Sequence, residues 1–351
     1  MAMLPGNGLK VQPSYVTRII SRIFLGVIVF SVINQFLTLP CVSQRERILR
    51  EESIISSHIQ PKSSASLAFR QSYGFFDDIT DAHWKIAQHL HKRAFPNFFA
   101  ASKLRKYANV ASDRGKYKKL GRSSWWNGEN FQQEFTCPHA QRIPSTSEAD
   151  GPKWVCDPHR LKKKDCLIYS VGSNGNVDFE RGIFEEIGPC EIHTFDMVTY
   201  NKRNGNFAKA LEGYSTFHPW GIGTEEQAEA YRRTKKGKEI KTLQQIMKDL
   251  GHENRTIDVF KIDCEWCEWF TYKSWLDENV FLRQILVETH NAPMPEARDF
   301  FFDLHDAGYV IFSKEANYQN SAGGVEFAFL KLHTEFFDGA LYKNLDKSAI
   351  G

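Results

Sequence analysis

The sequence predicts an α/β protein in which a mainly parallel sheet is wound with helices on both faces and ends in an antiparallel hairpin. Three observations lead to this prediction. After Pro158, short apolar segments alternate with segments of helical periodicity. Two apolar segments, Leu167 to Val171 and Ile257 to Ile262, run into a glycine turn and into a pair of carboxylates respectively. The last two, Tyr309 to Ser313 and Val325 to Leu332, have no helical segment between them.

The expected strands and helices follow one another in a regular order. The strands are Leu167 to Val171, Glu191 to Phe195, Tyr214 to His218, Ile257 to Ile262, Leu282 to Val287, Tyr309 to Ser313 and Val325 to Leu332. The helices are Phe179 to Ile187, Thr242 to Leu250, Glu265 to Leu276 and Pro295 to Ala307, after an earlier helix that starts at Asp81 and ends near Pro96. Thr242 and Gln245 match a capping box, and Gly251 is placed to end the same helix.

The first part of the chain does not follow this pattern. An uncharged apolar run from Ile23 to Leu39 follows several basic residues, which indicates a signal-anchor or transmembrane segment at 19–40. A cleaved secretory signal and a buried helix are the alternatives. The expected divisions are a disordered tail at 1–18, the membrane segment at 19–40, a stem at 41–75, a helical extension at 76–134, the α/β domain at 135–335 and a C-terminal tail at 336–351. We therefore expect a single-pass membrane protein facing the lumen of the secretory pathway or Golgi, or else a secreted protein.

Charge and cysteine content narrow the cellular setting. Lysine and arginine number 45 against 42 acidic residues, so the near-neutral balance argues against nucleic acid as a partner. The seven cysteines fit an oxidising compartment. Cys166 and Cys190 stand at the starts of two expected strands and can form a disulfide if those strands are neighbours, and Cys137 and Cys156 can form a second one. Reduced buried thiols are the alternative.

A glycine turn is the first candidate binding element. It follows the strand that ends at Val171 and contains Gly172, Ser173 and Gly175. Glycine lets the backbone bend sharply and lets a bulky ligand approach the next helix N-terminus. Asp196 ends the following strand, where nucleotide-binding folds place a carboxylate to accept hydrogen bonds from the two ribose hydroxyls. The alternative role for Asp196 is a helix N-cap.

A second group of candidate residues follows the next two strands. Asp263 and Glu265 come directly after one strand, and Glu288 and His290 close the other. We expect His290 to be the general base, because an imidazole titrates near neutral pH, with Glu265 and Glu288 orienting it or binding the acceptor. The alternatives are a solvated loop histidine, a salt-bridged Glu288, and a Glu265 that complements a helix dipole.

A metal centre is not expected. Asp263, Glu265 and His290 are residue types that can bind a divalent cation, but their spacing does not show that they share one cavity. Cys264 and Cys267 have the spacing of half a zinc site, yet the sequence has no second such pair, which excludes a zinc ribbon.

Several stretches of the chain resemble a known family. K-I-D-C-E-W-C-E at 261–268 resembles the K-I-D-V-E-G-A-E signature of FkbM-type methyltransferases, and I-L-V-E-T-H at 285–290 resembles the strand that follows it. D-G-P-K-W-V-C-D-P at 150–158, D-C-L-I-Y-S-V-G-S-N-G at 165–175 and C-E-I-H-T-F-D at 190–196 are similar to the eukaryotic methyltransferase-like domain of the methyltransferase-like protein 24 group.

This resemblance implies a class I methyltransferase (Rossmann-like) fold with a seven-stranded sheet and a terminal antiparallel hairpin. It implies S-adenosyl-L-methionine as the cofactor, with its methionine end in the space beside Gly172. The cofactor-binding residues that it implies are Gly172, Ser173, Gly175, Asp196 and, at the active edge, Asp263. Trp220 to Gly223 can contact the adenine or pack in the core. Trp266 stands where the FkbM signature has glycine, which can narrow the pocket.

The expected function is therefore S-adenosylmethionine-dependent methylation. FkbM relatives methylate sugars and related hydroxyl compounds, so the resemblance implies O-methylation of a glycan or another small hydroxyl-bearing acceptor. The alternatives are a secretory-pathway glycosyltransferase and a catalytically inactive, membrane-tethered binding module with the same fold. The expected partners are the acceptor and a membrane, through residues 19–40, without nucleic acid.

Overall fold

The computed structural model describes residues 66–98, 131–147, 151–162, 165–234, 239–290, 296–317 and 324–337. Within these ranges no helix combines the length and the apolar character needed to cross a bilayer. The predicted membrane segment at 19–40 lies outside the described residues, as do the predicted tails at 1–18 and, beyond residue 337, at the C-terminus.

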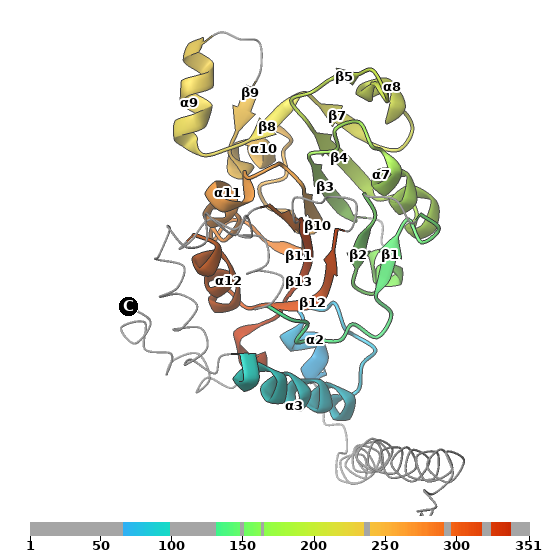
Figure 1. Ribbon diagram of the computed structural model, residues 1–351. Helices are drawn as coiled ribbons and strands as arrows, with labels where there is room; N and C mark the ends of the chain where they lie inside the picture. Colours follow the sequence, from blue (N-terminus) through green and yellow to red (C-terminus); the bar gives the residue numbers. More distant parts are fainter. Residues whose placement is uncertain are drawn as a thin grey trace, which may run out of the picture. The chain divides into compact units, whose positions relative to one another are not determined.

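A seven-stranded mixed sheet forms the centre of the molecule (Figure 1). Its strands are β3 (Leu167–Val171), β4 (Glu191–Phe195), β7 (Thr216–His218), β10 (Ile257–Ile262), β11 (Leu282–Thr289), β12 (Tyr309–Ala316) and β13 (Val325–Lys331). They lie in the order β12-β13-β11-β10-β3-β4-β7. The five strands from β11 to β7 are parallel, whereas β13 is antiparallel to both β11 and β12. The predicted α/β sheet with a terminal antiparallel hairpin is confirmed.

The order of the strands places a topological switch point at β3. From β3 the chain moves outward through β4 to β7, and then returns to the other side of β3 with β10 and β11. The connections on the two sides of β3 therefore leave in opposite directions. In open α/β sheets, ligands bind beyond the carboxyl ends of the strands at such a switch point.

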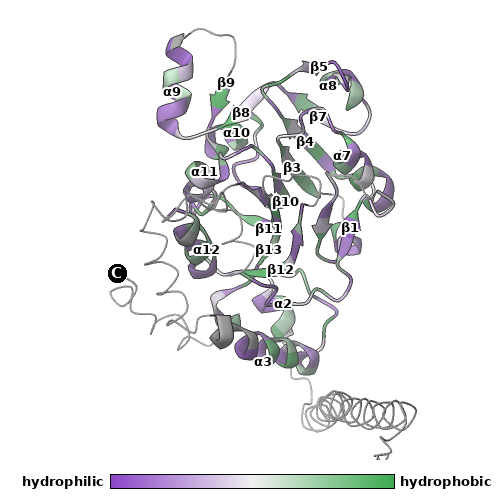
Figure 2. Ribbon diagram, in the orientation of Figure 1, coloured by the Kyte–Doolittle hydropathy of each residue, from purple (hydrophilic) through white to green (hydrophobic). Residues whose placement is uncertain are grey.

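Two layers of side chains cover the sheet. One face packs against α10 (Leu243–Asp249), α11 (Glu268–Trp275) and α12 (Glu296–Asp306), and its core includes Tyr169, Phe260 and Trp275. The core on the other face includes side chains from α2 (Leu67–Gln71), α3 (Asp81–Phe98), α7 (Asp178–Gly182) and β2 (Lys153–Val155). Figure 2 shows hydrophobic residues along the central strands and a largely hydrophilic α9 (Glu225–Thr234).

The remaining elements are short. They are β1 (Gln141–Ile143), η1 (Pro158–Leu161), the π-helical turn η2 (Ile183–Ile187), β5 (Tyr200–Asn201), β6 (Gly205–Asn206), α8 (Phe207–Ala210), β8 (Trp220–Ile222), β9 (Glu239–Lys241) and η3 (Thr334–Phe336). The sequence did not predict α9 or the pairs β1–β2 and β8–β9, because three-residue strands carry too few residues for a periodic pattern and α9 is strongly polar.

Several predicted helix boundaries needed correction. The helix expected from Glu265 begins at Glu268, because Glu265 and Trp266 have φ values of +52° and +89° and cannot be helical. The helix expected to end near Pro96 continues to Phe98. The capping box at Thr242 and Gln245 is present, with each backbone N–H bonded to the other side chain.

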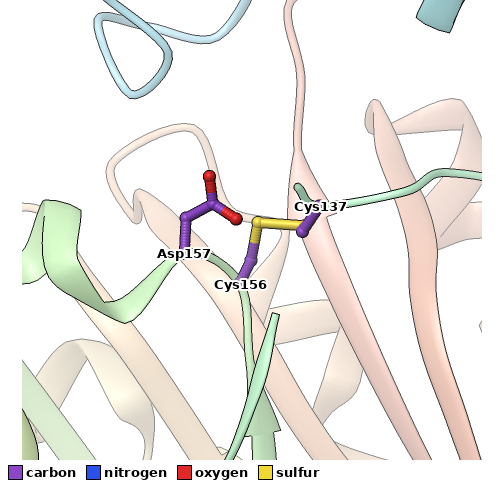
Figure 3. Close-up of side chains that lie close together, drawn as sticks. All are labelled: Cys137, Cys156 and Asp157. Carbon is purple, nitrogen blue, oxygen red and sulfur yellow. A yellow bond between two sulfur atoms is a disulfide. The ribbon is translucent and has the colours of Figure 1, made fainter. Parts of the chain in front are cut away.

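Three disulfides lie within the described residues. Cys166–Cys190 joins the starts of β3 and β4, as the sequence allowed for neighbouring strands. Cys137–Cys156 ties the segment before β1 to the end of β2, and Figure 3 shows it beside the carboxylate of Asp157. The third, Cys264–Cys267, was not predicted.

Candidate functional site

The carboxyl ends of four neighbouring strands bring the candidate residues to one edge of the sheet. The glycine turn follows β3, Asp196 follows β4, Asp263 follows β10, and His290 follows β11. Backbone hydrogen bonds join three of these strand ends: Gly172 N–H donates to Phe195 O, and Asp263 N–H donates to Val171 O, both at 2.9 Å.

Asp196 holds the glycine turn in place. Its Oδ2 accepts hydrogen bonds from the backbone N–H groups of Ser173, at 3.0 Å, and Asn174, at 2.7 Å. Its Oδ1 accepts from Val198 N–H at 2.7 Å. A carboxylate offers roughly four lone-pair positions. With three in use, Asp196 has room for about one further hydrogen bond rather than the two from ribose that the sequence suggested.

The two glycines of the turn serve close packing. Gly172 has φ +72°, and a Cβ there would lie 1.8 Å from the carbonyl oxygen of Asp263. Gly175 has φ +75°, and a Cβ there would lie 2.0 Å from a ring carbon of Phe207. The space beside Gly172 is therefore filled by the protein itself, which corrects the expectation that it receives the methionine end of a cofactor. A ligand at this edge has to approach from another side of the turn.

The acidic side of the site contains a directly opposed pair of glutamates. Glu288 on β11 pairs in register with Glu326 on β13, so both side chains emerge on the same face of the sheet. The ammonium of Lys153 lies between the acids: it is hydrogen-bonded to Glu326 and lies 3.7 Å from Glu288 and 3.6 Å from Asp263. Lys153 is only 2% exposed. A buried cation here offsets repulsion that two facing carboxylates would otherwise create.

Lys153 reaches this position because β2 lies across the sheet. Gln284 of β11 forms two hydrogen bonds to Cys156, accepting from its N–H at 2.8 Å and donating to its carbonyl at 3.1 Å. The Cys137–Cys156 disulfide then fixes the end of β2. Sequence reasoning assigned no role to Lys153 or Glu326. The one signal that could have singled out Lys153 is its place within the D-G-P-K-W-V-C-D-P stretch at 150–158, which resembles the methyltransferase-like protein 24 group.

His290 is buried and anchored to the start of α11. Its backbone N–H and its ring Nδ1 both contact Glu268 Oε1, at 2.8 and 3.2 Å, and its carbonyl accepts from the indole of Trp269. The other ring nitrogen, Nε2, lies 3.6 Å from both Glu265 and Glu288 and 3.8 Å from Asp263. At 4% exposed, His290 is not a solvated loop histidine. The structure therefore brings the three predicted catalytic residues, His290, Glu265 and Glu288, together.

The protonation of this cluster follows from its burial and charges. Burial, reinforced by the charges of Asp263 and Glu326 and opposed by Lys153, raises the pKa of Glu288 to about 8. Burial opposes a charge on His290, but the hydrogen bond and charge of Glu268 and the charges of Glu288 and Asp263 outweigh it and raise the pKa of His290 to about 9. Burial likewise opposes the ionised form of Asp263, yet Lys153, Lys261 and His290 keep its pKa below the usual value.

A constrained turn carries Glu265. The disulfide between Cys264 and Cys267 spans it, and both residues inside, Glu265 and Trp266, have positive φ. Trp266, which stands where the FkbM signature has glycine, adopts φ +89° and is 41% exposed. A left-handed backbone costs a non-glycine residue roughly 1–2 kcal/mol. The turn thus holds Glu265 next to His290 in a conformation that these residue types do not favour by themselves.

Asp263, Glu265 and His290 each place one donor atom within 4.8 Å of the others, a spacing that allows a metal ion. In this structure the ammonium of Lys153 lies 3.6 Å from Asp263 and supplies positive charge to that carboxylate. A second group of possible metal ligands, Glu191, His193 and His252, is joined by hydrogen bonds. In the third group, Cys137, Cys156 and Asp157, the two cysteines form a disulfide.

Trp220 is the first residue of β8. Its ring stacks on His218, with centroids 4.5 Å apart, and the Lys241 ammonium lies 3.5 Å from its centroid. Trp220 also packs partly against the core. Its ring is therefore engaged with protein groups on β7 and β9, and a contact with adenine stays a prediction.

A family model described as a methyltransferase domain matches residues 66–331, which is most of the chain. No curated protein sequence matches it.

Two solved structures are similar over part of the chain. The fibrillarin pre-rRNA processing protein of Methanococcus jannaschii is 12% identical, with a TM-score of 0.30 over 49% of this chain and 68% of that one. Fibrillarin of Aeropyrum pernix, in complex with natively bound S-adenosyl-L-methionine, is 11% identical, with a TM-score of 0.30 over 54% of this chain and 88% of that one. Similarity this distant supports no inference about this chain.

Proposed function

Because the chain belongs to a family of methyltransferase domains, we propose that it is an S-adenosylmethionine-dependent methyltransferase that acts on a hydroxyl group. The observation that carries this proposal is that Asp196, Asp263 and His290 follow the carboxyl ends of β4, β10 and β11, on the two sides of the switch point at β3. The assignment to the FkbM and methyltransferase-like protein 24 groups stays a prediction from sequence.

The proposed cofactor site lies beyond the carboxyl ends of β3 and β4, on the side of the glycine turn that faces away from the Asp263 carbonyl. When bound, the cofactor supplies an electrophilic methyl group on a positively charged sulfur. The cofactor contacts the turn that contains Gly172, Ser173 and Gly175. The remaining acceptor position of Asp196 takes a hydrogen bond from a ribose hydroxyl. The exposed carboxylate of Glu265 is the acidic group that a cationic ligand at this edge can meet.

The proposed base is the Glu288–His290 pair, whose nearest side-chain atoms lie 3.6 Å apart. In the reaction the acceptor oxygen attacks the methyl carbon, the carbon–sulfur bond breaks, and the hydroxyl proton has to leave. His290 Nε2 is the atom positioned to take that proton, and Glu268 fixes the ring through Nδ1. Because the two titrations are coupled, we assign the proton to the pair rather than to His290 alone.

The proposed acceptor is a glycan or another small hydroxyl compound in the secretory pathway. The resemblance to FkbM-type enzymes motivates this substrate class. Three disulfides among the described residues support an oxidising compartment, because such bonds rarely persist in the cytosol. The membrane segment at 19–40 belongs to the same proposal. Its test is protease protection of the full chain in sealed microsomes, where a lumenal domain stays intact until detergent is added.

Calorimetric titration with S-adenosylhomocysteine tests the cofactor. We expect binding to the wild-type chain and at least about tenfold weaker binding to Asp196→Ala, which removes a hydrogen-bond acceptor worth roughly 1.5–3 kcal/mol when charged. A folded Glu212→Ala variant, altered at an exposed acid near the end of α8, is the control. Binding of a nucleotide sugar without binding of S-adenosylhomocysteine would instead favour a glycosyltransferase.

Methyl transfer is measured separately from binding. The chain is incubated with S-adenosylmethionine labelled in its methyl group and with an array of free and protein-linked glycans, and the label is followed into the acceptor. Tight cofactor binding without transfer to any hydroxyl compound would favour the inactive binding module over the enzyme.

A further inference from the structure

We propose that Asn254 carries an N-linked glycan. Asn254-Arg255-Thr256 has the Asn-x-Thr form of an N-glycosylation acceptor, and it is the only Asn-x-Ser/Thr sequence in the 351 residues. This inference rests on the lumenal location proposed above, because the attachment takes place in the secretory pathway. The motif alone matches many unmodified sequences, so its structural setting has to carry the argument.

Asn254 lies at the tip of the connection between α10 and β10. The helix ends at Asp249 and the strand begins at Ile257. Between them His252 N–H donates to Met247 O at 2.7 Å, and Arg255 N–H donates to His252 O at 2.9 Å, which defines a tight turn. Asn254 is exposed in this turn. N-glycans are bulky and hydrophilic, and they are compatible with a folded domain at such surface positions.

Two residues close to Asn254, His252 and Arg255, fix the turn. His252 is 5% exposed; its Nε2 lies 3.1 Å from Glu191 Oε1 and its Nδ1 lies 2.7 Å from the hydroxyl of Tyr169. Arg255 binds the other carboxylate oxygen of Glu191 and the carbonyl of Asp165. His252 and Arg255 are therefore bound to β3, to β4 and to Asp165, which precedes β3. A glycan on the exposed Asn254 disturbs none of these contacts.

The proposed glycan lies far from the proposed active site. Asn254 precedes the amino end of β10, whereas Asp263 follows its carboxyl end. A strand of six residues spans roughly 20 Å at about 3.3 Å per residue. The glycan consequently extends from the edge of the sheet opposite to the one that holds His290. We expect it to affect solubility and folding in the lumen rather than methyl transfer.

The attachment is a group transfer with a defined donor. The amide nitrogen of Asn254 forms a bond to C1 of the first sugar of a lipid-pyrophosphate-linked oligosaccharide. The bond between C1 and the pyrophosphate oxygen breaks, the lipid pyrophosphate leaves, and the amide proton passes to a base of the host transferase. Threonine at the third position completes the acceptor sequence that this transferase recognises.

The test is expression of the full chain in a mammalian cell, followed by treatment with peptide N-glycosidase F. We expect the wild-type chain to shift to lower mass on treatment. Asn254→Gln and Thr256→Val should run at the lower mass without treatment, whereas Thr256→Ser, which keeps the acceptor form, should still shift. The Asn254→Gln chain should retain S-adenosylhomocysteine binding.

One control separates a wrong site from a wrong compartment. The substitution D346T completes a second acceptor sequence at Asn344, near the C-terminus. If this variant shifts and the wild type does not, the chain enters the lumen but Asn254 is unmodified, and the proposal is overturned. If neither shifts, the lumenal location fails and the proposal fails with it. Cofactor binding and methyl transfer, measured on the same preparations, report on the proposed function independently.

Discussion

Glu288 and Glu326 face each other directly across β11 and β13, and the buried ammonium of Lys153 lies against both. Two facing carboxylates inside a sheet are unfavourable by themselves. Lys153 comes from β2, which lies far away in sequence, and its charge makes the acidic cluster compatible with folding. The proposed active site therefore depends on a residue that is not expected to contact the acceptor.

Replacing Lys153 by methionine tests this dependence. Lys153→Met removes the cation but keeps the length of the side chain, and removal of one partner from a buried charge cluster costs about 3–5 kcal/mol. We expect a loss of unfolding free energy in this range and loss of methyl transfer. Urea denaturation and initial rates measure the two effects.

A second substitution shows whether the charge is responsible. Glu326→Gln removes one of the carboxylates that Lys153 neutralises, so the double variant Lys153→Met/Glu326→Gln should recover part of the lost stability. If the two losses simply add, as they do for residues that do not interact, Lys153 stabilises the fold by packing and not by neutralising Glu326.

Stability and activity should respond to pH in opposite directions. The folded protein raises the pKa of Glu288 from 4.5 to about 8 and that of His290 from 6.5 to about 9. The folded state thus binds more protons than the unfolded state between about pH 4.5 and pH 9, and the unfolding free energy falls as the pH rises through this range, with both groups contributing between about 6.5 and 8. Methyl transfer, which needs an unprotonated base, should rise over the same range.

Urea denaturation and single-turnover rates at pH 6 to 9.5 measure these two trends. In Glu288→Gln the stability should vary less with pH, because one of the two groups no longer titrates and His290 loses a negative neighbour. A rate that is flat between pH 7 and 9 would argue against the Glu288–His290 pair as the base.

The sheet was predictable from sequence because its strands are apolar and separated by helical periodicity. Leu167 to Val171 and Ile257 to Ile262 were placed with their observed bounds. His290, Glu265 and Glu288 came together because the carboxyl ends of parallel strands share an edge. Lys153 was missed because its position depends on β2, a strand of three residues held by Gln284 and a disulfide. Such tertiary contacts leave no periodic signal in the sequence.

The glycines of the turn illustrate a second limit. A sequence shows that Gly172 permits a sharp bend, but not which atoms use the space beside it. In the structure that space belongs to the carbonyl of Asp263. Tertiary packing and ligand binding both favour glycine at such a position, and only the folded chain distinguishes them.

Gly172→Ala should therefore be severely destabilising. The new Cβ would meet the Asp263 carbonyl at 1.8 Å, in addition to the cost of a left-handed backbone. Gly251→Ala is the matched control, because Gly251 has nearly the same φ, +71°, with nothing within 4 Å of the added carbon. We expect about 1–2 kcal/mol of lost stability for Gly251→Ala and a larger loss for Gly172→Ala. Thermal unfolding of both variants checks this; equal losses would mean that Asp263 moves aside easily.

The disulfide at the proposed active site should matter more for activity than for stability. Cys264–Cys267 closes a loop of only four residues, and the chain-entropy model gives such a short loop about 2 kcal/mol. Its removal frees the turn that keeps Glu265 3.6 Å from His290, and Glu265 and Trp266 can then leave their left-handed conformations. Cys264→Ser/Cys267→Ser should consequently reduce kcat by at least about tenfold, since misplaced groups in active sites readily cost up to about a hundredfold.

The matched control is Cys166→Ser/Cys190→Ser, which removes the disulfide at the amino ends of β3 and β4, away from His290. Its longer loop gives it a larger entropic contribution, roughly 3 kcal/mol, so this variant should unfold at a lower temperature than the other. Well below its unfolding temperature, however, its kcat should stay close to that of the wild-type protein. If kcat instead falls in step with thermal stability in both variants, the turn at 264–267 has no special part in placing Glu265, and its disulfide serves the fold alone.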